Sequence, residues 1–449
     1  MRWPLAIISL LLPFVFLPLA FDPFQLPKET LFHLATLAVL GPWLWTVFRA
    51  GSVRLAKTGV AVPVLLFLFI GLLSVFQAPY KVEALATVRD ATCAVVIFFL
   101  AAASLSPEDR LVPNCLGLAA LATATLGLSQ SLLGPNIPWL PSTQGGALVG
   151  DVTTAAVFVA VLLPLLWDLM LFSRGNWAWI WTAGSGVAAG FVVLSRTRAA
   201  WLALMAGALC LMALAVRSSF SREQDSASSG SSRRLHLFAS GALALLIVLW
   251  GVYGAGIVLF SNPPSFKTSE LQGWVLREDA WRVTRSMIFA HPLGAGAGNW
   301  RYVFASEAGA ARPRTGFGAT RLPLQCGNEF LQVTAELGAA GAFLLLWTAF
   351  GLFRTGWRRA EEGSRFPAGT SVACLAGMAA ASLLTSGDGV GQVAPLLERG
   401  GQGQPGRGVG GIQPESGSNL LLGHIRLARF QGARGGKGAR RKGSGIQLG

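Results

Sequence analysis

Long apolar runs separated by short polar connections dominate the pattern of this chain. Each run is close to the roughly 20 residues that a helix needs to cross the hydrocarbon core of a bilayer. We mark these stretches at residues 3–20, 31–48, 59–77, 84–104, 111–133, 152–172, 177–195, 199–216, 235–260, 331–353 and 370–385. Because backbone polar groups in lipid must be paired within the segment, the stretches are predicted to be helices. The pattern predicts an all-α polytopic membrane protein with about 10–12 transmembrane helices.

The composition supports the same class of protein. Apolar residues make up 53% of the chain and charged residues 13%, whereas charged residues make up about 25% of an average soluble protein. The five cysteines are scattered and show no metal-ligand spacing, so neither a metal site nor a disulfide framework is predicted. No cofactor is expected. The apolar start resembles a secretory signal peptide, but further helices follow at once, which favours a retained helix.

Basic residues gather in every second connection, which predicts a cytoplasmic N-terminus. In this orientation the inner connections hold Arg49, Arg54, Lys57, Arg110, Arg174, Arg217, Arg222, Arg233, Arg234, Arg354, Arg358, Arg359 and Arg365. This bias explains much of the net charge of +15 without nucleic acid as a partner. One outer connection departs from the rule, because Ser195–Arg198 places two arginines outside.

The predicted organisation has four parts. Residues 1–260 hold transmembrane helices 1–9, and 261–330 form one large periplasmic loop. Residues 331–385 hold helices 10–11, and 386–449 form a Gly- and Arg-rich tail that is either disordered or the product of a shifted reading frame. Within the loop, the apolar and basic positions of 274–290 predict an amphipathic helix suited to lying along the membrane surface.

Three short segments carry the motifs of the chain. Leu194–Leu202 reads LSRTRAAWL at the start of an apolar stretch. Arg277 and Trp281 precede the sequence HPLGAGAGNW at His291–Trp300. Gly327–Gly341 reads GNEFLQVTAELGAAG, where the chain returns to the membrane.

In their order, spacing and outer location, these segments resemble the O-antigen ligase and polymerase family, over roughly residues 1–385. The resemblance implies a multi-pass enzyme of the bacterial inner membrane. It would transfer a glycan from an undecaprenyl-diphosphate carrier to a glycan or lipid acceptor at the periplasmic face. The family has a catalytic histidine where this chain has Gly327. The resemblance therefore leaves the identity of the base open.

Candidate site residues follow from the chemistry of such a transfer. Arg196 and Arg198 suit a diphosphate, because guanidinium groups bind phosphate bidentately and stay charged. Fixed arginines would also neutralise the leaving diphosphate without a metal. A second group of candidates for substrate binding is Arg277, Arg285 and Asn328. A base for the acceptor hydroxyl is sought among Glu329, His291 and Glu336.

Structural interpretations stand beside these functional ones. The arginines at 196 and 198 fit contacts with lipid headgroups, and those of 277–285 fit a solvated helix face. Asn328 fits a helix cap, and His291 fits the start of a turn. Two other functions compete with the transferase: a transporter or flippase of lipid-linked glycans, and an inactive homologue. Because the polar motifs gather at one membrane face, chemistry at the surface is favoured over transport.

Overall fold

The computed structural model describes residues 2–20, 22–51, 58–105, 109–133, 146–173, 175–221, 264–311, 323, 325–361, 371 and 373–378. The chain divides into two units, Met1–Ala394 and Pro395–Gly449, and all described residues belong to the first. The expected helix at 235–260, most of that at 370–385 and the tail at 386–449 lie outside the described residues.

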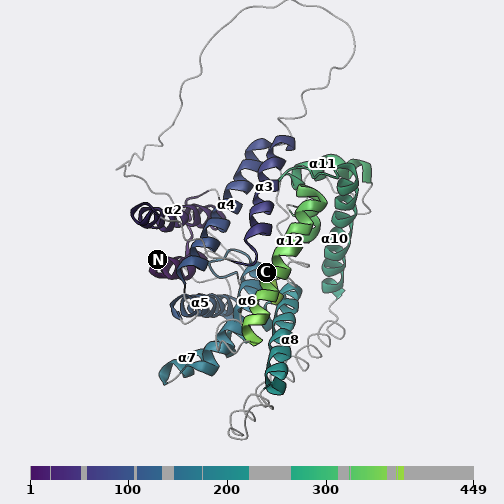
Figure 1. Ribbon diagram of the computed structural model, residues 1–449. Helices are drawn as coiled ribbons and strands as arrows, with labels where there is room; N and C mark the ends of the chain where they lie inside the picture. Colours follow the sequence, from purple (N-terminus) through teal and green to yellow (C-terminus); the bar gives the residue numbers. More distant parts are fainter. Residues whose placement is uncertain are drawn as a thin grey trace, which may run out of the picture. The chain divides into compact units, whose positions relative to one another are not determined.

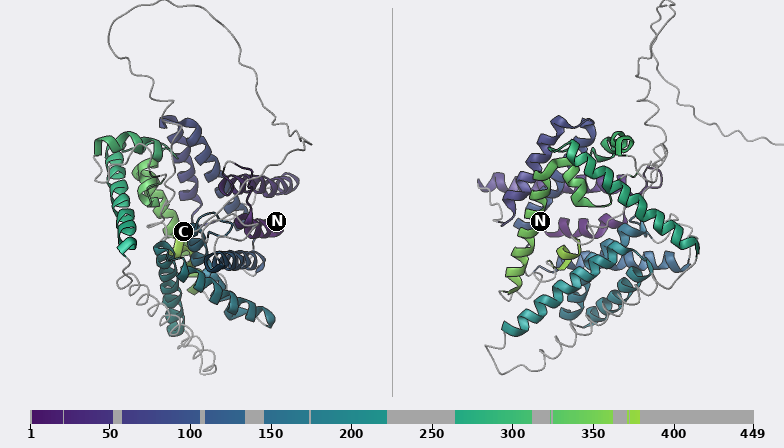
Figure 2. Two further views of the ribbon diagram at one scale, coloured as in Figure 1. Left: turned by 180° about the vertical axis from the view of Figure 1, so that it is seen from behind. Right: turned by 90° about the vertical axis from the view of Figure 1, so that its right-hand side faces the viewer.

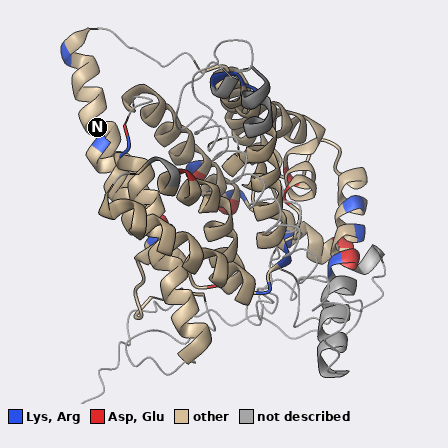
Figure 3. Cartoon of the chain, turned by 90° about the horizontal axis from the view of Figure 1, so that it is seen from below, with Lys and Arg blue, Asp and Glu red and all other residues tan. Residues whose placement is uncertain are grey.

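The described part of the chain is helical and contains no strand. Its elements are α1 (Arg2–Leu11), η1 (Leu12–Phe14), α2 (Gln25–Ala50), α3 (Ala61–Gln77), α4 (Lys81–Ser104), α5 (Leu111–Leu133), α6 (Val152–Phe172), α7 (Asn176–Leu194), α8 (Arg198–Ser221), α10 (Pro264–Ala290), α11 (Trp300–Ala311) and α12 (Glu329–Glu361) (Figure 1). Six of these are long and apolar enough to cross a membrane, and three other apolar helices are shorter. Charged residues are sparse along the described helices (Figure 3). The prediction of an all-α polytopic membrane protein is confirmed.

The predicted length of the first helix, residues 3–20, is wrong. The α-helix ends at Leu11, a single 3-10 turn follows, and Val15 is already extended. Pro13 explains the break, because proline lacks the N–H that an α-helix would need at that point. By contrast, the expected stretches at 111–133 and 152–172 coincide with α5 and α6. The Asp151 carboxylate caps α6 by accepting the Thr154 N–H at 2.8 Å.

The largest apolar core lies among α5, α6, α7 and α8. Leu163 and Leu166 of α6 are fully buried in it, together with Trp181 and Phe191 of α7. A second core joins α10 and α11 to α12: Val283 and Met287 of α10 and Trp300 and Phe304 of α11 are buried together with Ala335 of α12. The buried side of α10 therefore faces protein, whereas Phe289 on the same helix is 86% exposed. The expectation that this helix lies along the membrane surface stays a prediction.

Helix α12 connects this second core with the membrane helices, because it packs against α3, α10 and α11 (Figure 2). It is kinked at Gly338, whose backbone is left-handed with φ 69°. The kink separates a short first part, 329–337, from the long apolar remainder. The first part holds most of the third sequence motif.

Candidate functional site

The glycine loop, which we define as His291–Asn299, is held between the first part of α12 and the α3–α4 hairpin. On one side, the N–H groups of Ala295 and Gly296 donate to the carbonyls of Ala335 and Glu336 at 2.8 and 2.9 Å. On the other side, Asn299 pairs with the backbone of Tyr80: its Oδ1 accepts the N–H at 2.9 Å and its Nδ2 donates to the carbonyl at 3.2 Å. The loop thus joins α12 to the α3–α4 hairpin, which lies far earlier in the sequence.

The glycines of this loop permit close approach to other elements. At Gly294, where φ is +97°, a Cβ would lie 2.3 Å from the Glu336 carbonyl oxygen. At Gly298, where φ is +65°, it would lie 2.2 Å from Thr87 Oγ1 on α4. Any side chain would push the loop away from both partners. The Gly-x-Gly-x-Gly pattern is therefore explained by packing between helices.

Glu336 is the centre of the polar contacts in this region. The residue is buried, with 7% of its surface exposed. One carboxylate oxygen accepts the Gly298 N–H at 2.8 Å, and the other accepts from Gln332 Nε2 at 3.2 Å. Gln332 Oε1 in turn accepts the Cys326 N–H at 3.3 Å. The carboxylate therefore fixes the glycine loop directly and the turn before α12 through Gln332, which supports a positioning role.

The turn before α12 contains three residues singled out in the sequence. Asn328 caps the helix, because its Oδ1 accepts the Leu331 N–H at 3.1 Å, as the structural interpretation expected. Glu329 is exposed at the first position of α12. Gly327 is buried and has a left-handed backbone with φ 72°.

His291 directly follows α10 and begins the glycine loop. Its N–H donates to the Met287 carbonyl at 2.8 Å, and its own carbonyl accepts the Gly294 N–H at 2.9 Å. The imidazole is half-exposed, with Nε2 4.0 Å from a carboxylate oxygen of Glu307 on α11. The expected turn is therefore present, and the side chain remains open to the surface.

Cys326 lies in the apolar core beneath the turn. Its thiol is 3.4 Å from Thr284 Oγ1, and its carbonyl accepts from Trp281 Nε1 at 3.1 Å. Trp300 Nε1 donates to the same threonine hydroxyl at 3.0 Å. Burial raises the pKa of the Cys326 thiol to about 11. The thiol is therefore neutral near pH 7.

The predicted arginines lie on other elements. Arg196 is exposed in the α7–α8 turn with a left-handed backbone, φ 52°, and Arg198 is half-buried at the start of α8. Trp201 Nε1 donates to the Val192 carbonyl at 3.2 Å and so ties α8 to α7. On α10, Arg277 is half-buried and Arg285 exposed. The structure thus brings His291, Asn328, Glu329 and Glu336 together around the glycine loop and first part of α12, and presents Arg196 and Arg198 at a separate turn.

Sequence reasoning missed a cluster that joins α4 to α11. Arg301 forms an ion pair with Glu83, and the Tyr302 hydroxyl donates to Glu83 at 3.2 Å. The rings of Tyr80 and Tyr302 stack with centroids 4.1 Å apart. The sequence did contain a signal for this cluster: Glu83 lies near the start of an otherwise apolar stretch, and an unpaired carboxylate in a membrane helix is costly.

The fold is that of a polytopic α-helical membrane protein, and the candidate site is a polar, glycine-rich cluster at the start of the long apolar helix α12. Comparison with known families agrees: residues 183–346 match the family model described as O-antigen ligase. This segment runs from α7 into α12 and includes all three sequence motifs. The expected resemblance to the O-antigen ligase and polymerase family is confirmed there. A search of curated proteins found no match.

Proposed function

We propose that the protein transfers a glycan from an undecaprenyl-diphosphate carrier to an acceptor hydroxyl at the periplasmic face of the bacterial inner membrane. The family match supports the coarser conclusion, a ligase- or polymerase-like enzyme that acts on lipid-linked glycans. The finer proposal rests on one observation. The matched segment combines two exposed or half-exposed arginines at a membrane-helix turn with a rigid polar loop at a helix mouth.

In the proposed reaction, Arg196 and Arg198 bind the diphosphate of the carrier. Guanidinium groups suit this role, because they donate paired hydrogen bonds and keep their charge as the phosphate leaves. When the acceptor oxygen attacks the first sugar carbon, the bond from that carbon to the phosphate oxygen breaks. The arginines stabilise the negative charge that develops on the departing diphosphate, and no metal is needed for this step.

Glu336 acts in this proposal by holding the glycine loop in place. Both of its oxygens accept hydrogen bonds from the loop or from Gln332. The acceptor would enter beside this loop, whose far end is fixed by the hydrogen bonds between Asn299 and Tyr80. Holding two reactants in the correct orientation can lower the activation barrier by about 7–11 kcal/mol, so precise positioning is a large part of catalysis.

The test is a transfer assay in proteoliposomes that contain polyprenyl-diphosphate-linked glycan and a lipid acceptor. Arg196→Ala and Arg198→Ala should abolish transfer while leaving the amount of inserted protein unchanged. The lysine variants should restore only part of it, because lysine lacks the planar fork. Arg354→Ala, which removes an exposed arginine from the later part of α12, is the matched control.

Full transfer by the double alanine variant would mean that the arginines contact only lipid headgroups. Movement of the labelled glycan across the bilayer without transfer would instead support the transporter. Neither transfer nor movement by the wild-type protein would support the inactive homologue.

A further inference from the structure

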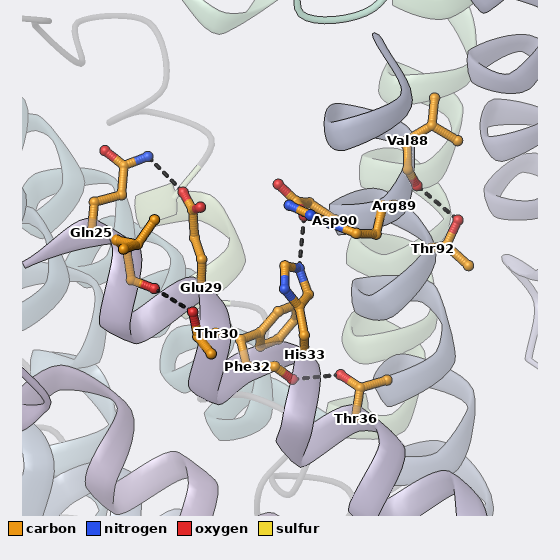
Figure 4. A network of polar contacts seen from close by, with 11 residues as sticks. Gln25, Glu29, Thr30, Phe32, His33, Thr36, Val88, Arg89, Asp90 and Thr92 are labelled. Atoms are coloured by element: carbon orange, nitrogen blue, oxygen red, sulfur yellow. Dashed lines mark hydrogen bonds and ion pairs between the residues drawn. The ribbon is translucent and has the colours of Figure 1, made fainter. Parts of the chain in front are cut away.

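A second polar cluster lies between α2 and α4 (Figure 4). His33 Nε2 is 2.8 Å from Asp90 Oδ1, and the same oxygen accepts from Arg89 Nε at 3.0 Å and is 2.9 Å from Arg89 Nη2. Both helices are among the six that are apolar and long enough to span a membrane. Ionisable groups in such helices are expensive and usually functional. This cluster lies outside the segment that matches the family model.

The geometry orients the imidazole for proton transfer. Because a carboxylate only accepts hydrogen bonds, the His33 nitrogen that faces Asp90 carries the proton, and Nδ1 is left as an acceptor. A base that is oriented by a third group is the arrangement used to activate hydroxyl nucleophiles. The His33 side chain is 22% exposed and that of Asp90 41%. The pair can therefore be reached from outside the protein core.

The cluster lies close along α4 to the glycine loop. Glu83, Thr87 and Asp90 share one face of the helix, because residues three and four apart are neighbours. Thr87 is the residue against which Gly298 packs, and Asp90 follows it after about 4.5 Å of helix rise. His33 lies about 12 Å along the axis from the start of α2, and Asp90 about 14 Å from the start of α4. Glu336 lies about 10 Å from the start of α12, which is a similar depth. In the predicted topology, all three helices begin at the outer face.

The charged groups around His33 are few among the described residues. Helix α2 itself carries Lys28, whose Nζ donates to the Leu148 and Val149 carbonyls, and Glu29, which accepts from Gln25 Nε2. Its remaining charged residue, Arg49, lies in the last turn over the Trp45 ring. Of the elements packed against α2, η1 carries no charge and α1 carries only Arg2. The charged residues of α4 are Lys81, Glu83, Arg89 and Asp90. Asp90 is the group bonded to the imidazole.

We propose that His33 is the general base of the reaction and that Asp90 positions it. This inference rests on the proposed function. The acceptor O–H gives its proton to His33 Nδ1, and the oxygen electron pair forms the bond to the first carbon of the donor sugar. The bond from that carbon to the phosphate oxygen breaks, and its electron pair leaves with the diphosphate. The imidazolium, stabilised by Asp90, then returns its proton to water.

The experiment measures the transfer rate of His33→Gln against pH in the proteoliposome assay. Glutamine keeps a nitrogen donor for Asp90, so it preserves a structural link between the helices, but it cannot accept a proton. The expected result is a loss of about 10²- to 10⁴-fold, disappearance of the acidic limb of the pH profile, and an unchanged KM for the donor. Glu29→Gln, which removes a charge one helical turn away, is the matched control and should keep the wild-type rate and profile.

A His33→Gln rate and pH profile like those of the wild type would overturn the proposal. Asp90→Asn provides a second route if the first variant does not accumulate. It should slow transfer by more than about 10-fold while donor binding is retained, because the amide no longer fixes the imidazole proton. An unchanged rate in that variant would also overturn the proposal. Absence of transfer by the wild-type protein would refute the proposed function itself. This differs from failure of the His33 proposal alone, in which the wild type is active and the variants keep its rate.

Discussion

Gly294→Ala is the sharpest test of how the glycine loop is held. The backbone at this position has φ +97°, and a new Cβ would lie 2.3 Å from the Glu336 carbonyl oxygen and 2.7 Å from the Gly338 nitrogen. Both obstacles are backbone atoms, so no side-chain rotation relieves the clash. The loop can accept alanine only by moving away from α12.

The size of the effect follows from the contacts that oppose it. Holding a non-glycine residue in this backbone conformation costs about 1–3 kcal/mol. Movement away from α12 breaks the bonds of Ala295 and Gly296 to Ala335 and Glu336, each contributing about 0.5–1.5 kcal/mol. We therefore expect the docked loop to be destabilised by about 2–6 kcal/mol, which is a factor of about 30–30 000 in its equilibrium.

Amide hydrogen exchange of the protein in lipid nanodiscs measures this directly. The amides of Ala295 and Gly296 should lose about 30- to 30 000-fold of their protection, and the transfer rate should fall with them. Gly186→Ala is the control, because Gly186 is exposed on α7 and an added Cβ meets nothing within 4 Å. Unchanged protection and activity in Gly294→Ala would refute the described clamp between the loop and α12.

Three further predictions concern single positions. A protein whose only cysteine is Cys326 should react with maleimide about 100-fold more slowly when folded than when denatured at pH 7, since burial raises the thiol pKa to about 11; equal rates would contradict this. Gly327→His should lower the free energy of unfolding by about 1–2 kcal/mol, because φ is 72° there, and should not increase transfer; an increase would show that this position lacks an imidazole. Alkaline phosphatase fused near Lys267 should be active and a fusion near Asp225 inactive, and the reverse result would overturn the topology.

The sequence predicted the helices well where the apolar runs end at clear signals. Both α5 and α6 have the expected limits, and Asp151 supplies the cap that defines one of them. The first helix was wrong because Pro13 interrupts a run that hydrophobicity alone would extend. The pattern of α10 indicated two faces correctly, but periodicity does not say whether lipid or protein covers the apolar face.

The candidate site was predicted in part. The motifs placed Glu336 and Asn328 at the mouth of α12, and the capping interpretation of Asn328 is confirmed. The contacts of Asn299 with Tyr80, and of His33 with Asp90, could not be predicted. They join residues 219 and 57 positions apart, and no local pattern specifies such long-range pairs. The catalytic assignments remain predictions that the substitutions above test.

The contacts also bear on whether the segment matched by the family model can work alone. Four of its contacts reach into earlier helices: Asn299 binds Tyr80, Arg301 pairs with Glu83, Ala297 N–H donates to Ser74 Oγ, and Gly298 packs on Thr87. Without α3 and α4 the loop would lose these partners on one side and keep only those of α12 on the other. A buried carboxylate such as Glu336 would then be exposed to competing water, and its bond to Gly298 would weaken. The α3–α4 hairpin is therefore part of the candidate site, which is consistent with the proposed base on α2, the helix that packs against α4.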